Sequence, residues 1–115
     1  MLGLGDTFLI KTPPSNRDHL FILVAFNENK ALLVNVTSNQ SDVTCKLYRG
    51  NHRFLTHTSY INYKDAMMAE ISAIENALRL GVISSHDAVS SVLLSRIIQG
   101  AKNSPNFNPE YLTYL

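Results

Sequence analysis

Residues 20–38, LFILVAFNENKALLVNVTS, decide the fold that this sequence predicts. The stretch holds two apolar runs, 20–26 and 31–36, on either side of the turn-forming residues 27–29. Both runs are apolar at nearly every position, which is typical of strands that are covered on both faces. We therefore expect an antiparallel strand hairpin in the core of the protein.

Polar residues stand at both ends of this hairpin. His19 enters the first strand, and Thr37 and Ser38 leave the second. In an antiparallel pair joined by a short turn, the start of one strand lies beside the end of the next. The sequence therefore places His19 and Thr37 together at one rim of the sheet.

The rest of the chain divides into strands followed by helices. Strands are expected at 7–10, 43–48 and 59–63, with a short one at 54–55 and a proline-containing loop at 11–18. Helical spacing of apolar residues predicts helices at 70–80 and 90–102. The capping residue Asn108, followed by Pro109, predicts a short terminal turn at 110–115. This order predicts one α+β domain: a small, partly closed antiparallel β-barrel (1–63) followed by two or three C-terminal helices (64–115).

The composition is that of an ordinary globular domain. The 115 residues are 45% hydrophobic and 17% charged, with a net charge of +1. Such a small net charge gives no global field to attract nucleic acid, so binding would need a local patch. The single cysteine, Cys45, allows no internal disulfide and fits the cytoplasm. No apolar run approaches the length of a membrane span, so we expect no membrane association.

Basic and aromatic residues share one window of the sequence. No acidic residue falls between 43 and 64, a window that holds Lys46, Arg49, Arg53, Lys64 and three tyrosines. Cations that meet phosphates and rings that stack on bases suit a single-stranded nucleic acid. The alternative is a solvent-exposed strand edge, where lysine and arginine prevent pairing with the strand of another chain. The sequence leaves both interpretations open.

Three of the four histidines lie in or beside the strand-rich half: His19, His52 and His57. Metal-free RNA cleavage needs a base for the 2′-hydroxyl, an acid for the leaving 5′-oxygen and donors for the phosphorane charge. These histidines, with Thr37 and Ser38, are residues of the required kinds. Each histidine taken singly is also compatible with a structural, hydrogen-bonded role.

Other chemistries lack their sequence patterns. His52 and His57 do not match the spacing of a zinc site, no Gly-x-Ser-x-Gly elbow is present, and no glycine-rich phosphate loop follows a strand. We therefore expect neither a metal nor a cofactor.

The order of these parts resembles the MazF/PemK-like toxin family. The resemblance lies in Gly5-Asp6 before the first strand, a proline-containing loop, HLFILV entering the next strand, LLVNVTS ending in threonine and serine, and SYINYKDA before the helices. It implies an SH3-like β-barrel with appended helices, usually a homodimer. It also implies metal-independent cleavage of single-stranded RNA, silenced by a cognate antitoxin protein.

The resemblance places the family's threonine on Thr37, with Ser38 after it, and the family's arginine on or beside His19. Histidine in place of arginine leaves three outcomes open: a histidine-based ribonuclease, a different substrate or an inactive binding domain. The segment 51–60 has no counterpart in the family pattern, and we expect it to mark a divergent branch that uses His52, Ser59 or Tyr60.

The leading hypothesis is an endoribonuclease toxin. Its predicted catalytic residues are His19, Thr37, His52 and His57, and its predicted RNA-binding residues are Arg17, Ser38, Arg53, Ser59 and Tyr60. Two alternatives remain. One is a non-catalytic barrel module that binds a protein or nucleic acid, and the other is a structural accessory domain with incidental histidines.

Overall fold

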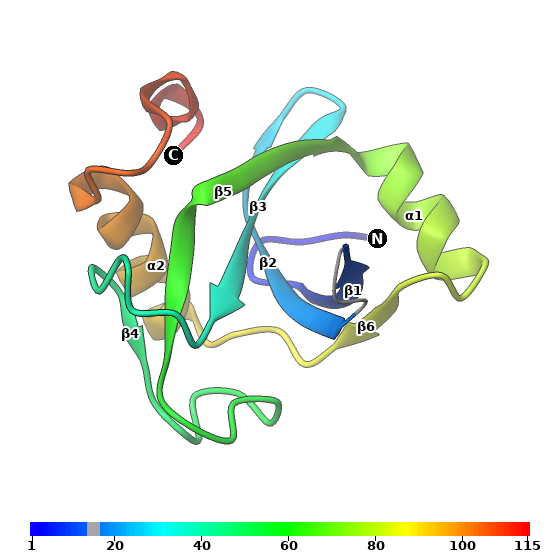
Figure 1. Ribbon diagram of the computed structural model, residues 1–115. Helices are drawn as coiled ribbons and strands as arrows, with labels where there is room; N and C mark the ends of the chain where they lie inside the picture. The colour runs from blue at the N-terminus through cyan, green and yellow to red at the C-terminus, as the bar shows by residue number, and fades with distance from the viewer. Residues whose placement is uncertain (14–16) are drawn as a thin grey trace.

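A computed structural model describes residues 1–13 and 17–115 of the chain (Figure 1). The elements in order are β1 (Thr7–Thr12), β2 (Arg17–Asn27), β3 (Lys30–Thr37), β4 (Lys46–Leu47), β5 (Ser59–Glu70), α1 (Ile71–Arg79), β6 (Ser84–His86), α2 (Ser91–Asn103) and the 3₁₀ helix η1 (Pro109–Tyr114). In this part of the chain, no helix is long and apolar enough to cross a membrane.

The strands form one antiparallel sheet in the order β4-β5-β3-β2-β1-β6. The sheet curls into a half-closed barrel, and α1 and α2 pack on opposite sides of it (Figure 1). The predicted α+β class, with a partly closed barrel and C-terminal helices, is confirmed.

The β2–β3 hairpin forms the centre of the core, as the apolar runs predict. Its strands are paired from Phe21↔Asn35 to Asn27↔Lys30, and Glu28 takes the positive φ of 57° that the tight turn requires. Side chains alternate between two apolar clusters. One cluster, with Ile22 and Val34, packs against α2, and the other, with Leu23 and Leu33, packs against Ile74 of α1. Because both faces are covered, nearly every residue of the hairpin strands is apolar.

Strands extend further along the chain than expected. β5 continues from Ser59 to Glu70, past the predicted end of the strand-rich half at residue 63, and β6 lies between the two α-helices. The extension of β5 pairs with β3, with Met67 opposite Leu33 and Met68 opposite Leu32. Tertiary pairing therefore makes a strand of residues whose local sequence gives no strand pattern.

The strand predicted at 43–48 is mostly irregular, and only Lys46–Leu47 pairs as β4. Val43 is 61% exposed, whereas Cys45 and Leu47 are buried, so the buried face that strand alternation would give this segment does not include Val43. Asp42 explains the difference, because its carboxylate accepts hydrogen bonds from the backbone N–H and hydroxyl of Thr44 and holds this segment in a turn.

Two further loop predictions need revision. Phe54 lies in a turn and Leu55 in irregular backbone, not in a strand. The predicted 11–18 loop is shorter, because β1 and β2 pair as far as Thr12↔Arg17. Residues 14–16 of that loop lie outside the described residues.

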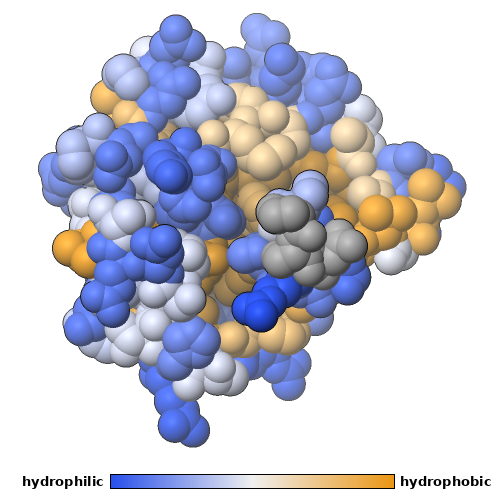
Figure 2. All heavy atoms as spheres, in the orientation of Figure 1, coloured by the Kyte–Doolittle hydropathy of each residue, from blue (hydrophilic) through white to orange (hydrophobic). Residues whose placement is uncertain are grey.

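Each helix begins and ends within one residue of its predicted bounds. The side chain of Ser90 caps α2 by accepting a hydrogen bond from the Leu93 N–H, and Asn108 caps η1 in the same way with Glu110. Leu93, Ile97 and Ala101 are the buried stripe of α2. The surface is largely hydrophilic in the view of Figure 2, with an apolar patch at the right. Leu80 and Val82, which follow α1 in the chain, are 62% and 71% exposed.

Candidate functional site

A cavity of about 350 Å³ opens at the rim of the sheet, where β2 begins and β3 ends. We call it the rim cavity. It is lined by Leu9, Arg17, Asp18, His19, Leu20, Val36, Thr37, Ser38, Phe54, Leu55, His57 and Ser59. Its walls therefore come from β1, β2, β3, the loop that precedes β5 and the first residue of β5.

His19 and Thr37 meet at this rim because of the register of the hairpin. Phe21 is opposite Asn35, so the residues two positions further out, His19 and Thr37, face each other along the same strands. Both side chains are partly buried. The Thr37 hydroxyl oxygen accepts a hydrogen bond from the Asn39 N–H at 3.1 Å, which fixes its position at the strand end.

His57 and Ser59 enter the rim cavity from the loop before β5. His57 is exposed, and its Nδ1 lies 3.3 Å from the Thr56 hydroxyl. Ser59 is buried, and its hydroxyl donates to the His57 carbonyl at 3.2 Å. One hydrogen bond therefore ties the position of Ser59 to the backbone that carries the imidazole of His57.

Asp18 also lines the cavity, next to Arg17. Its carboxylate lies 3.9 Å from the ammonium group of Lys11 across the β1–β2 pair, and both side chains are well exposed. Asp18 is not among the site residues predicted from the sequence. The signal was available, because Asp18 immediately precedes His19 at the same strand end.

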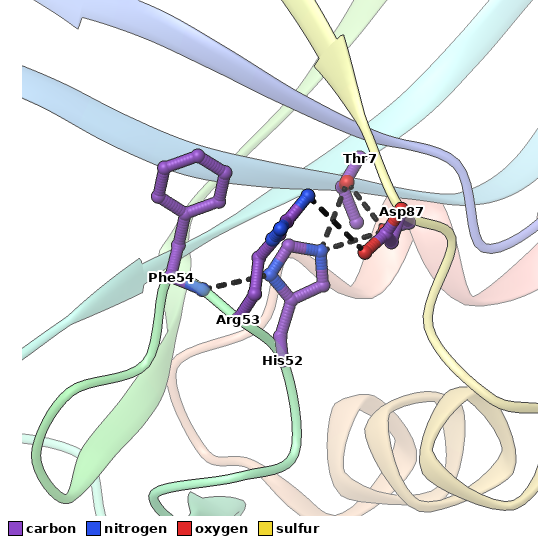
Figure 3. Close-up of polar contacts among 5 residues, drawn as sticks. All are labelled: Thr7, His52, Arg53, Phe54 and Asp87. Carbon is purple, nitrogen blue, oxygen red and sulfur yellow. Dashed lines mark hydrogen bonds and ion pairs between the residues drawn. The ribbon is translucent and has the colours of Figure 1, made fainter.

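His52 lies outside the lining of the rim cavity and is 6% exposed. Figure 3 shows Thr7 and Asp87 together on one side of its ring and Phe54 on the other. Nδ1 accepts a hydrogen bond from the Phe54 N–H at 3.2 Å, so Nε2 carries the proton and donates to the Asp87 carbonyl at 2.6 Å. The Thr7 hydroxyl donates to the same carbonyl at 2.8 Å. These contacts give His52 a structural role that fastens the loop to the edge of the sheet.

Arg53 and Tyr60 are the other two predicted residues that do not line the rim cavity. The Arg53 guanidinium lies 3.9 Å from the Asp87 carboxylate, an exposed ion pair, and Tyr60 is 8% exposed. The cavity does bring together the remaining predicted residues: Arg17, His19, Thr37, Ser38, His57 and Ser59.

The predicted basic and aromatic strip is only partly available on the surface. Tyr60 and Tyr63 are buried, so neither ring can stack on a base. Tyr48 is 51% exposed, and the Lys46 ammonium lies 5.3 Å from the centre of its ring. Burial of the other two tyrosines favours the rim cavity over this strip as the place for a ligand.

Across residues 1–13 and 17–115, no group of three or more histidine, cysteine, aspartate or glutamate side chains is arranged to hold a metal ion. In comparisons with known proteins, no protein-family model, no curated protein and no solved structure matches this chain. The resemblance to MazF/PemK-like toxins therefore rests on the residues quoted for it above.

Proposed function

We propose that the rim cavity is the active site of a metal-independent endoribonuclease that cleaves single-stranded RNA. The observation that carries the proposal is the lining of the cavity. Two histidines, an arginine and three hydroxyl side chains from three separate stretches of the chain, 17–19, 37–38 and 57–59, converge on one space of about 350 Å³. This volume lies at the lower end of the range for small-molecule sites and suits one nucleotide unit.

The two histidines supply the acid–base chemistry in this proposal. One imidazole, in its neutral form, takes the proton from the 2′-hydroxyl as that oxygen attacks phosphorus. The other, as imidazolium, gives its proton to the departing 5′-oxygen. The bond from phosphorus to the 5′-oxygen breaks as the bond to the 2′-oxygen forms, which leaves a 2′,3′-cyclic phosphate and a free 5′-hydroxyl. With His52 committed to its structural contacts, this pair is His19 and His57.

The remaining polar residues hold the phosphate. The Arg17 guanidinium offers several donors in a geometry that matches two phosphate oxygens. The hydroxyl groups of Thr37, Ser38 and Ser59 are additional donors for the charge that develops on the phosphorane. The Asp18 carboxylate accepts hydrogen bonds and suits the orientation of a histidine or a ribose hydroxyl.

The partners follow from the resemblance to the toxin family. We expect a cytoplasmic protein that acts on single-stranded RNA, forms a homodimer and is silenced by a cognate antitoxin. The departure at His19 changes the expected mechanism, because a neutral imidazole can accept a proton and arginine cannot.

The test is incubation of the purified protein with a mixed-sequence single-stranded RNA in the presence of EDTA. We expect cleavage products that end in a 2′,3′-cyclic phosphate. His19→Ala and His57→Ala should each reduce the rate by at least about 100-fold, the usual contribution of acid–base catalysis. His86→Ala is the matched control, because His86 does not line the cavity. It should retain the wild-type rate.

Two results would overturn the proposal. One is the absence of cleavage across varied RNA sequences together with the absence of growth arrest on expression. The other is cleavage that survives in the double variant His19→Ala/His57→Ala. RNA binding by both forms without turnover would instead support the non-catalytic binding module.

A further inference from the structure

A second hollow, of about 390 Å³, adjoins the rim cavity and shares His19 and Thr37 with it. We call it the face hollow. It is lined by Thr12, Pro13, His19, Phe21, Asn35, Thr37, Asn62, Asp65 and Met67. Phe21 also belongs to the apolar cluster beneath α1, so the hollow continues the sheet face that α1 covers elsewhere.

Asn35 is the unusual residue of the face hollow. It interrupts the apolar run of β3, it is only 9% exposed, and its side-chain oxygen is buried without a hydrogen-bond partner among the described residues. A buried acceptor without a donor destabilises a fold. An acceptor of this kind at the wall of a hollow therefore points to a ligand that supplies the donor.

Its neighbour across the sheet does not supply that donor. Asn62 is directly opposite Asn35 in the β3–β5 pair, but its Nδ2 donates to the Asp65 carboxylate at 2.7 Å. The register between β3 and β5 shifts at this point, because Asn35 is opposite Asn62 whereas Leu33 is opposite Met67. Residues 63–66 of β5 therefore form a bulge opposite the single residue Val34. Bulges re-aim side chains beside functional sites, and this one carries Asp65 to the hollow.

The chemistry of the lining defines the class of ligand. Asn35 Oδ1 and the Asp65 carboxylate are acceptors, and Phe21 and Met67 are apolar walls against which a ring can pack. A planar heterocycle with an exocyclic amino group satisfies both requirements. Asparagine recognises adenine in this way, with its oxygen accepting from the amino group. Uracil has a carbonyl oxygen at the 4-position, where cytosine has its amino group. A uracil bound in the same orientation would therefore place its O4 acceptor against the Asn35 acceptor.

We infer that the face hollow binds a nucleobase that carries an exocyclic amino group and discriminates against uracil. Because the hollow meets the rim cavity at His19 and Thr37, the bound base belongs to the nucleotide beside the scissile phosphate. That assignment rests on the proposed function, whereas binding of the base itself can be measured independently of cleavage.

The test compares matched nucleotide pairs by NMR titration of the wild-type protein at millimolar concentrations. CMP and UMP differ at the 4-position of one ring, and AMP and IMP differ at the 6-position of another, in each pair by amino against carbonyl. We expect CMP and AMP to bind at least about tenfold more tightly than UMP and IMP, a difference of about 1.4 kcal/mol. The shifted signals should include the side-chain amide of Asn35.

Asn35→Leu is the decisive variant, because it keeps the size of the side chain and removes the unpartnered oxygen. It should melt no lower than the wild type while losing the preference for amino-bearing bases. Asn103→Leu, on the exposed surface of α2, is the matched control and should retain that preference. Equal binding of the nucleotides in each pair, no binding of any nucleotide, or an unchanged preference in Asn35→Leu would overturn the inference.

The two proposals fail in different ways. RNA cleavage without a base preference at any position would refute the proposed base site and support the proposed ribonuclease activity. The opposite result is also possible: the protein cleaves no RNA but binds amino-bearing nucleotides selectively through Asn35. That result would refute the ribonuclease activity and support the base site.

Discussion

Gly100 lies within α2 at the point where the helix meets β5. A Cβ atom at this position would come far closer than 3.0 Å to the hydroxyl oxygen of Tyr63, 3.0 Å from Tyr63 Cζ and 3.1 Å from Cys45 Cβ. Tyr63 has no room to retreat, because its side chain is fully buried and its hydroxyl donates to the Ile97 carbonyl at 2.7 Å. Gly100→Ala therefore has two opposite effects on stability: a gain in helix propensity and a loss from steric overlap with Tyr63.

The two effects differ in size. Alanine in a helix interior gains about 1 kcal/mol over glycine. Overpacking a core costs about 1–3 kcal/mol, and displacing the Tyr63 hydroxyl from its carbonyl adds roughly 1–2 kcal/mol. We expect Gly100→Ala to lower the free energy of unfolding by about 2–3 kcal/mol, which for a domain of this size is a fall in Tm of roughly 10 °C. Urea denaturation and thermal melting, both followed by circular dichroism, measure these two quantities.

A double-mutant cycle identifies the cause. Tyr63→Phe removes the nearest clashing atom, so Gly100→Ala should cost less when it is combined with Tyr63→Phe, with a coupling of about 1–2 kcal/mol. Ser95→Ala, at an exposed position of the same helix, is the control for propensity alone and should be neutral or slightly stabilising. A Gly100→Ala variant that is more stable than the wild type, or a cycle without coupling, would refute the close-packing explanation.

Two further predictions concern buried polar contacts. Burial raises the pKa of Asp42, but hydrogen bonds from Thr44, Ser104 and the side-chain amide of Asn106 lower it by more. The pKa is therefore about 2, below the ordinary 3.8. The resulting stabilisation is roughly 2 kcal/mol. It is present above pH 3.8 and is lost as the pH falls through 2. Asp42→Asn should therefore be less stable than the wild type at neutral pH, and urea denaturation at several pH values should show that its stability lacks this acid dependence. His52→Ala should destabilise the protein by about 2–3 kcal/mol and speed hydrogen exchange of the Phe54 amide, measured by NMR; unchanged exchange would contradict its fastening role.

The parts of the fold that local patterns encode were predictable from the sequence. The apolar hairpin and the helical stripes each bury a face that the spacing of apolar residues marks out. β6 could not be predicted in this way, because Ser84, Ser85 and His86 have no apolar pattern and pair with β1 through the backbone. The extension of β5 likewise depends on a partner strand that is distant in the sequence.

The same distinction, between features that local patterns encode and features that depend on distant segments, applies to the candidate site. The proximity of His19 and Thr37 follows from antiparallel register, which the sequence contains. The position of His52 depends on the Asp87 carbonyl and the Thr7 hydroxyl, and no spacing rule brings those groups together. Asn35 is not among the predicted site residues because it lies within an apolar run, although a lone amide on the same strand face as Thr37 is a usable signal.

The pairing of β1 with β6 has a consequence for how the chain reaches this structure. β1 can join β2 as soon as both have left the ribosome, but its other edge stays open until β6 emerges after α1. Closing that long loop is entropically costly and comes late in folding. Until then the segment Thr7-Phe8-Leu9 presents unpaired backbone groups along this edge, the usual template for association between chains. The short polar strand β6 is thus the segment that ends the interval during which the nascent protein is open to aggregation.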